Sequence, residues 1–177
     1  GIVIISSTIG VSLGSLAGFK GGWFDTIILR IIEIMTGIPT LMIAMFHMGF
    51  LGHSMWSVIA ALGFPGFVVE TRITRGQFLA FREHEFVTGA QAIGASQLRI
   101  AFLHIFPNVV PVLAVLIAFQ IPAAIFAEAG LSFLGLGIDE PTPRLGKMVS
   151  ASLAYVRVYW HMGLFPSIMI AIITLGF

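Results

Sequence analysis

The run IFPNVVPVLAVLIAFQIPAAIFA, at residues 105–127, contains no charged residue. A bilayer core about 30 Å thick is crossed by a helix of about 20 apolar residues, so this run has the length of one transmembrane helix. Four further apolar runs, each with few charges, lie outward from it at residues 2–18, 26–50, 55–72 and 162–177. Spanning β-strands are disfavoured, because the runs lack the alternation of barrel segments. The sequence therefore predicts an all-α, polytopic membrane protein, a helical bundle with about five spans.

The composition excludes an ordinary water-soluble domain. Of the 177 residues, 58% are apolar and 10% are charged, and the mean hydropathy is +1.02. A soluble domain carries about 25% charged residues. The net charge of +1 excludes a nucleic-acid binder that relies on a large positive charge. The absence of Cys excludes disulfides, thiol catalysis and Cys-ligated metals from this chain, and membrane lipid is its expected surrounding.

Three glycines in the first run, Gly10, Gly14 and Gly18, recur every four residues. Two overlapping Gly-x-x-x-Gly patterns of this kind allow two membrane helices to approach closely. We therefore expect this face of the first helix to pack directly against another helix.

The basic residues are divided unequally between the two sides of the predicted bundle. Five spans place the loop 19–30 and the segment 72–104 on one side. That side holds Lys20, Arg30, Arg72, Arg75, Arg82 and Arg99, and the other holds Arg144, Lys147 and Arg157. Because cytoplasmic loops carry an excess of Lys and Arg, the first side is predicted to be cytoplasmic.

The cytoplasmic segment 81–107 is long enough to hold structure of its own. Its first half carries an apolar face with helical spacing, formed by Phe86, Val87, Ala90 and Ile93. Gly94 suits the end of that helix, and Ser96 suits the N-cap of a second one. Two interpretations of this exposed ridge stay open: an amphipathic helix that lies on lipid, or a docking element for another protein.

The outer segment 131–161 contains a second amphipathic stretch. Its apolar positions recur with helical spacing at Leu145, Met148, Val149, Leu153 and Val156. Tyr155, Tyr159 and Trp160 follow closely and suit an interfacial aromatic belt. The pattern predicts a helix lying in the outer membrane interface.

The ionisable residues near the spans have two interpretations each. Arg30 and Glu33, three residues apart, form either a local ion pair or a coupling or gating contact. Glu128, at the outer end of the fourth span, either lines a translocation path or snorkels to the interface. The five histidines show no His-Glu-x-x-His pattern and no i,i+4 pair, so no metal site is predicted.

Three separated motifs resemble the permeases of ATP-binding-cassette (ABC) importers. The first, EFVTGAQAIGAS at residues 85–96 with HIFPN at 104–108, is similar to the cytoplasmic coupling loop of that family, and Gly94 and Pro107 have the family's spacing. The second, EAGLSFLGLG at 128–137 with PTPRLGKM at 141–148, resembles an outer segment of the dipeptide, oligopeptide and nickel subfamily. The third, AGFKGGWFD at 17–25, is similar to the same subfamily. Taken together, the chain resembles the second permease subunit of that subfamily.

The resemblance implies a permease subunit that does no chemistry itself and binds no cofactor. ATP would be hydrolysed by two separate ABC ATPase subunits, and the chain indeed lacks a Gly-x-x-x-x-Gly-Lys-Ser/Thr phosphate loop. Further implied partners are a homologous second permease and an extracytoplasmic substrate-binding protein, in the inner membrane of a prokaryote. The residues implied in ATPase coupling are Glu85, Phe86, Val87, Thr88, Gly89, Ala90, Ala92, Ile93, Gly94, Ala95 and Pro107.

The resemblance covers essentially the whole chain. It implies a single transmembrane domain that begins in the second of six spans, ends in the sixth, and so is truncated at both ends. Thr88 and Gly89 depart from the family motif, which has Glu and Ala there. Pro107 is expected to start the span after the loop, where its missing N–H costs little.

The transported solute implied by the resemblance is a peptide, nickel or a related small solute. The alternative is a passive channel or a membrane scaffold whose amphipathic loop lies on lipid. A channel has no need of a cytoplasmic docking ridge, so that ridge separates the two functions.

Overall fold

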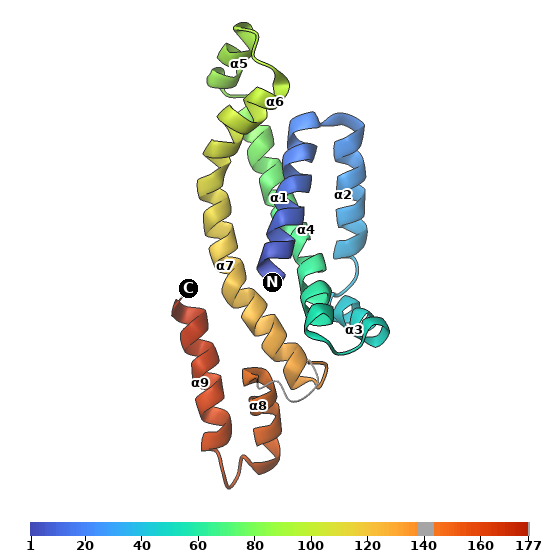
Figure 1. The fold of residues 1–177 in the computed structure, drawn as a ribbon, viewed down its shortest axis with the longest axis vertical. Helices are drawn as coiled ribbons and strands as arrows, with labels where there is room; N and C mark the ends of the chain where they lie inside the picture. Colours follow the sequence, from blue (N-terminus) through green and yellow to red (C-terminus); the bar gives the residue numbers. More distant parts are fainter. Residues whose placement is uncertain (138–143, 177) are drawn as a thin grey trace. The chain divides into compact units, whose positions relative to one another are not determined.

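The computed structural model describes residues 1–137 and 144–176, and these residues form helices joined by short connections (Figure 1). The α-helices are α1 Ile2–Lys20, α2 Gly22–Thr36, α3 Thr40–Leu51, α4 Met55–Arg82, α5 Glu85–Ala92, α6 Gln97–Arg99, α7 Phe106–Phe133, α8 Leu145–Ser152 and α9 His161–Gly176. A π-helical segment, Ile100–Ile105, joins α6 to α7, and a 3₁₀ turn, Leu153–Tyr155, follows α8. No strand occurs within the described ranges, and the predicted all-α membrane fold is confirmed.

Three helices are long and apolar enough to cross a membrane: α1, α4 and the continuous helix Gln97–Phe133. The predicted span 26–50 is instead two helices, α2 and α3, which are separated at Gly37, Ile38 and Pro39. Counting that pair as one span gives four, and α9, at the fifth predicted position, is shorter than these. The predicted second span is therefore interrupted next to Pro39, because a proline disfavours helical geometry in the residue before it.

The chain divides into two compact units. One unit, which we call the α5 unit, comprises Ile4–Ile38 and Gly66–Ile117. The other, the α8 unit, comprises Gly1–Val3, Pro39–Pro65 and Ala118–Phe177.

In the α5 unit, α1 packs against α4 through its glycines. A Cβ atom added to Gly14 would lie 2.6 Å from the carbonyl oxygen of Thr71, and one added to Gly18 would lie 2.6 Å from that of Arg75. A Cβ on Gly10 would lie 2.5 Å from the Cβ of Glu70. The predicted close helix contact is confirmed, because none of these positions has room for a side chain.

Two apolar clusters complete the α5 unit. The first joins α1, α2 and α4 and consists of Ala17, Ile28, Ile32, Phe67 and Val68. The second joins α4, α5, the π-helical segment and α7 and consists of Phe78, Val87, Ala90, Ile100, Ala101, Ile105, Val109 and Leu113. The helix α5 is thus attached to two long helices of its own unit.

The α8 unit has one apolar cluster, formed by Ala44, Met48, Val58, Ala61, Leu62 and Leu131 from α3, α4 and α7. The helix α8 lies against α7, because a Cβ on Gly146 would collide with the backbone of Ala129. The predicted amphipathic stretch is helical here but ends at Ser152. Residues 138–143, including Pro141–Pro143 of the outer motif, and Phe177 lie outside the described residues.

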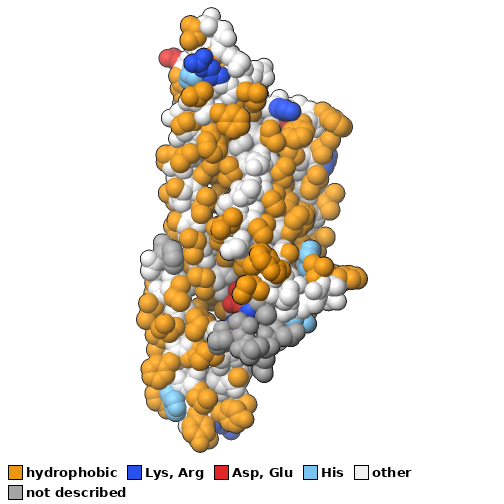
Figure 2. Space-filling view, viewed as in Figure 1, with side chains coloured by type: hydrophobic (Ala, Val, Ile, Leu, Met, Phe, Trp, Pro, Cys, Tyr) orange, Lys and Arg blue, Asp and Glu red, His pale blue; other side chains and the backbone are white. Residues whose placement is uncertain are grey.

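Hydrophobic side chains remain exposed along the helices (Figure 2). On α7 they include Val115, Phe119 and Phe126, and on α3 they include Met42, Phe46 and Phe50. A soluble monomer rarely exposes so much contiguous apolar surface, so these faces suit lipid or partner helices.

Candidate functional site

The end of α5 has the geometry of a Schellman motif. The N–H of Ala95 donates to the carbonyl of Ala90 at 3.0 Å, and the N–H of Gly94 donates to that of Gln91 at 2.9 Å. Gly94 has φ of +80°, a left-handed conformation that other residues adopt only with strain. The predicted helix stop at Gly94 is therefore confirmed, and its left-handed conformation favours glycine.

The second helix of the segment starts where Ser96 predicts. The Ser96 hydroxyl accepts a hydrogen bond from the backbone N–H of Arg99 at 3.4 Å, as an N-cap side chain does. From Gln97 onward the helix is continuous to Phe133, through the π-helical segment. Pro107 thus lies inside a continuous helix, one residue after α7 begins, and does not itself start the span.

The π-helical segment explains how the helix tolerates Pro107. The N–H of Phe106 donates to the carbonyl of Ala101, five residues back, so the turn before the proline is widened. The side chain of Asn108 donates to the carbonyl of His104 at 2.6 Å, which adds a hydrogen bond across the turn that contains the proline. The segment after α5 is therefore bonded continuously into α7.

The two faces of α5 have different surroundings. Val87 is 1% exposed and Ala90 is also buried, both in the cluster with Ile100 and Ile105, whereas Ile93 is 85% exposed. The single exposed ridge predicted from periodicity is wrong in this respect, because Val87 and Ala90 contact the chain's own core. We call the exposed side of the helix, together with its C-cap, the exposed face of α5, and it consists of Glu85, Phe86, Thr88, Gly89, Gln91, Ala92 and Ile93.

Two other predicted coupling residues, Ala95 and Phe86, contact neighbouring side chains of the same unit. Ala95 is partly buried against the same cluster as Val87. The ring of Phe86 lies 5.6 Å from that of His84 and 6.4 Å from that of Phe81, centroid to centroid. This aromatic group supports the first turn of α5 on the end of α4.

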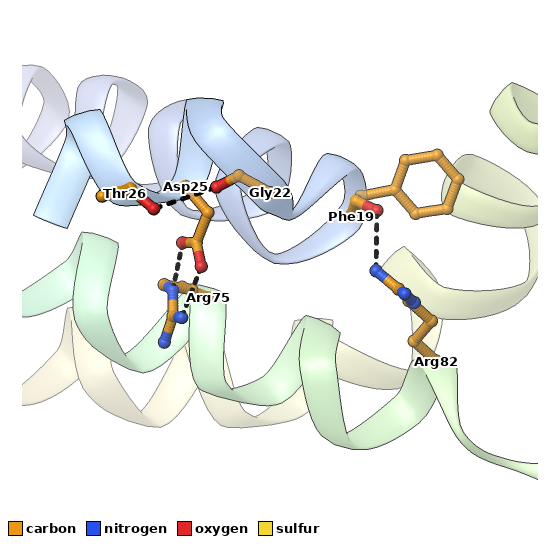
Figure 3. Close-up of polar contacts among 6 residues, drawn as sticks. All are labelled: Phe19, Gly22, Asp25, Thr26, Arg75 and Arg82. Atoms are coloured by element: carbon orange, nitrogen blue, oxygen red, sulfur yellow. Dashed lines mark hydrogen bonds and ion pairs between the residues drawn. The ribbon is translucent and has the colours of Figure 1, made fainter.

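Arginines of α4 hold α1 and α2 in place (Figure 3). The Arg75 guanidinium donates two hydrogen bonds to the carboxylate of Asp25 in α2, through Nε and Nη2, and the second measures 2.6 Å. Arg82 donates to the carbonyl of Phe19 at 3.3 Å. Arg72 donates to the hydroxyl of Thr36 at 3.1 Å. From the sequence these arginines indicated only the orientation of the chain, although their spacing places them on one face of a helix.

Glu70 is a further residue that sequence analysis missed. Its side chain is fully buried between α1 and α4, and its Oε1 accepts a hydrogen bond from the hydroxyl of Ser7 at 2.7 Å. Its Oε2 has no hydrogen-bond partner in the part of the chain that the structure describes. The available signal was an acidic residue inside an apolar run, opposite small and hydroxyl residues of the first helix.

The predicted pair of Arg30 and Glu33 is a local ion pair, with Nη1 of Arg30 2.8 Å from Oε2 of Glu33. Both side chains are exposed, so the local interpretation is confirmed, and a coupling or gating role stays a prediction. Glu128, the third residue predicted to line a path or act in gating, belongs to the α8 unit.

The carboxylate of Glu128 is paired within its own unit. Its Oε1 accepts hydrogen bonds from Nη1 of Arg144 at 2.8 Å and from the hydroxyl of Ser132 at 2.9 Å. The sequence left Glu128 either as a path residue or as one that snorkels to the interface, and it did not indicate the pairing with Arg144. Both residues line a pocket of about 370 Å³ whose other walls are apolar.

The described residues form apolar helices of spanning length, with the short helix α5 between two of them, and this arrangement defines a polytopic membrane protein. Residues 10–177 match the family model described as binding-protein-dependent transport system inner membrane component. The chain belongs to this family of bacterial inner-membrane transport components.

Curated relatives of the chain are also named as permease proteins of transport systems. The chain is 37% identical over 175 residues to a dipeptide transport system permease protein of Bacillus subtilis, covering 98% of the chain and 55% of that protein. It is 37% identical over 175 residues to an oligopeptide transport system permease protein of the same organism, covering 98% and 57%. A glutathione transport system permease protein of Pectobacterium atrosepticum is 32% identical over 175 residues, covering 99% and 58%. The chain thus spans little more than half the length of these relatives.

Proposed function

We propose that this chain is part of a transmembrane permease subunit of an ATP-driven importer, and that α5 couples it to a separate ATPase. The observation that carries the proposal is the division of α5 into a buried face and an exposed one. Val87 and Ala90 anchor the helix in the core, while Ala92 and Ile93 are free for a partner. A helix held in this way presents a rigid apolar surface to a groove.

The contacts of α5 would allow a movement of this helix to be passed on to the long helices α4 and α7. Its buried residues pack on Phe78 of α4 and on Ile100 and Ile105, which lead into α7. The ion pair of Arg75 with Asp25 connects α4 to α2. A partner that moves α5 would therefore move these helices together, as alternating access requires.

The remaining parts of the proposed importer follow from the family and from the chain's chemistry. Two separate ATPase subunits would bind and hydrolyse ATP, and a second permease and an extracytoplasmic binding protein would complete the complex. The relatives' names include dipeptide, oligopeptide and glutathione. We therefore propose peptides as the transported class, with nickel or another small solute as the alternative.

The experiment that tests coupling is a cross-link. Because this chain lacks Cys, a single Cys at Ala92, which is exposed on α5, provides a unique thiol in the full-length permease once other native Cys are removed. A second Cys is introduced in the groove of the ATPase of the same importer. A disulfide whose yield changes with ATP is expected, and a Cys at the exposed Met148 of α8 is the control that should give none.

The opposite result favours the second candidate function. Exposed Ile93, Leu98 and Phe102 also suit contact with lipid. If no cross-link forms and the thiol at residue 92 is instead shielded by lipid, the ATPase-coupling proposal fails and a passive channel or scaffold takes its place.

A further inference from the structure

Charged and hydroxyl side chains lie exposed along one side of the helix pair α2 and α4, within the α5 unit. On α2, the side chains of Arg30 and Glu33 are 75% and 56% exposed. On α4, Arg72 is exposed as well. We call this side the polar face of α2 and α4, and it consists of Thr26, Arg30, Glu33, Thr36 and Arg72.

The polar face lies along the spanning part of these helices and not at their ends. A Cβ on Gly14, near the middle of the apolar helix α1, would lie 2.6 Å from the carbonyl oxygen of Thr71. The neighbouring Arg72 is therefore level with Gly14. Glu33 follows Ile32, which belongs to one apolar cluster with Ala17 of α1 and with Phe67 and Val68 of α4.

The side chain of Arg72 extends away from the nearer end of α4. Arg75 bonds Asp25 of α2, whereas Arg72 bonds Thr36 of the same helix. The two arginines are three residues apart, about 4.5 Å along α4, but Asp25 and Thr36 are eleven residues apart, about 16 Å along α2. The two guanidinium groups therefore diverge, and that of Arg72 points toward the interior of the span. This direction is the opposite of snorkelling, in which a basic side chain reaches for the interface.

Arg30 is directed in the same sense. Its guanidinium bonds Glu33, which lies almost one turn further from the start of α2 at Gly22. Ionisable side chains within a span avoid lipid and face protein or a water-filled cavity. The polar face therefore requires polar surroundings at a depth where lipid offers none.

The charges of the polar face do not cancel. Arg30 is paired with Glu33, and the neighbouring Arg75 is paired with Asp25. Arg72 has a hydroxyl partner but no carboxylate partner among residues 1–137 and 144–176. Water can occupy the donors that this guanidinium leaves free, and the unbalanced charge makes the potential there positive.

We propose that the polar face lines a water-filled cavity of the permease, and that Arg72 gives this cavity a positive potential, which favours anionic groups over cationic ones. The inference rests on the proposed function, because a translocation path requires water at this depth. It adds Arg72, and a sign of charge, to the predicted path residues Arg30 and Glu33.

The test compares two single-Cys variants of the complete importer in lipid nanodiscs, with other native Cys removed. Val69→Cys places a thiol on the exposed side of α4, almost one turn from Arg72, at a position that is 55% exposed. Ile31→Cys is the matched control, at a position that is 48% exposed. Ile31 lies on the side of α2 opposite Glu33, because two residues differ by about 200° around a helix.

The two reporter positions have a similar depth, because their neighbours Val68 and Ile32 belong to the same apolar cluster. Charged methanethiosulfonates react with thiols in water and are excluded from lipid. They should label Val69→Cys at least about tenfold faster than Ile31→Cys, since only the first thiol would face the cavity.

Two reagents of opposite charge measure the potential of the cavity. At Val69→Cys, the labelling rate of the anionic sulfonatoethyl reagent is divided by that of the cationic trimethylammonium-ethyl reagent. Arg72→Gln should lower this ratio about threefold, because the nearest unpaired cation is removed. Glu33→Gln should raise it, because Arg30 then lacks its carboxylate. The control Arg157→Gln, which removes an exposed arginine of the α8 unit, should leave it unchanged.

Two outcomes overturn the proposal. Equal labelling of Val69→Cys and Ile31→Cys would mean that lipid or a second permease covers the polar face, and an unchanged ratio in Arg72→Gln would remove the positive potential. ATP-driven peptide uptake in proteoliposomes and the α5 cross-link are measured in parallel. Intact uptake and cross-link without selective labelling remove only the cavity, whereas loss of both removes the proposed function itself.

Discussion

Arg75 in α4 and Asp25 in α2 form an ion pair with two hydrogen bonds, although 50 positions separate them in the chain. Their side chains are 24% and 15% exposed, so both charges are largely removed from solvent. Paired bonds between a guanidinium and a carboxylate fix orientation as well as distance. The pair therefore sets the position of α2 beside the last part of α4, ten residues before α5 begins at Glu85.

Removing one member of this pair should destabilise the importer. Arg75→Gln leaves Asp25 partly buried without its cation, and we expect a loss of about 1.5–3 kcal/mol in the free energy of unfolding. The measurement is thermal unfolding of the purified complex in detergent. The matched control is Arg30→Gln, which removes a 75% exposed arginine from an i,i+3 pair and should cost about 0.2–0.5 kcal/mol.

A double variant tests whether the two charges interact directly. Asp25→Asn combined with Arg75→Gln should be less destabilised than the sum of the single variants, because neither charge is then left alone. Strict additivity of the two losses would show that the contact contributes nothing.

The glycine contact between α1 and α4 gives a second prediction. Gly14→Ala places a Cβ 2.6 Å from the carbonyl oxygen of Thr71, so the helices must separate. Overpacking of this kind costs about 1–3 kcal/mol, and the yield of folded complex should fall accordingly.

The control for this substitution lies in the partner helix. Gly76 of α4 has nothing within 4 Å of an added Cβ. Gly76→Ala should be neutral or stabilising by up to about 1 kcal/mol, because alanine favours the helix. Equal losses from both substitutions would refute the tight packing of α1 on α4.

The turn after α5 gives a third prediction, on coupling. Gly94→Val forces a β-branched residue to φ of +80°, at a cost of at least about 1–2 kcal/mol, and should loosen the Schellman turn. We expect ATP hydrolysis to persist while peptide uptake falls, with the complex still assembled.

Asparagine tolerates the left-handed conformation better than other residues, so Gly94→Asn should retain more uptake than Gly94→Val. Uptake and hydrolysis are measured on the same proteoliposomes. Normal coupled uptake by Gly94→Val would remove the assigned role of this turn.

The parts of the fold that sequence predicted are those fixed by local chemistry. The end of α5 at Gly94 and the cap at Ser96 follow from backbone conformation and from hydrogen bonds to near neighbours. The close approach of α1 follows from the spacing of its glycines, which needs no knowledge of the partner helix. Each of these features is determined by residues that are close to one another in the sequence.

The features of the fold that the sequence did not predict depend on which helices contact each other in the folded chain. Periodicity placed Val87 and Ile93 on one face, but burial by α4 and α7 separates them. Arg144 meets Glu128 across 16 positions, and no local pattern specifies that pairing. In a membrane chain both faces of a helix are apolar, so hydropathy does not reveal which face packs inward.

The two faces of α5 give the last prediction, because they separate docking from folding. Ile93→Ser changes an exposed side chain and should weaken association with the ATPase while leaving thermal stability within about 0.5 kcal/mol. Val87→Ala removes buried methyl groups and should destabilise the permease by about 1–3 kcal/mol. Co-purification of the ATPase measures the first effect and thermal unfolding the second. Loss of ATPase binding with Val87→Ala but not with Ile93→Ser would reverse the assignment, and would mean that α5 turns its buried face outward when the ATPase binds.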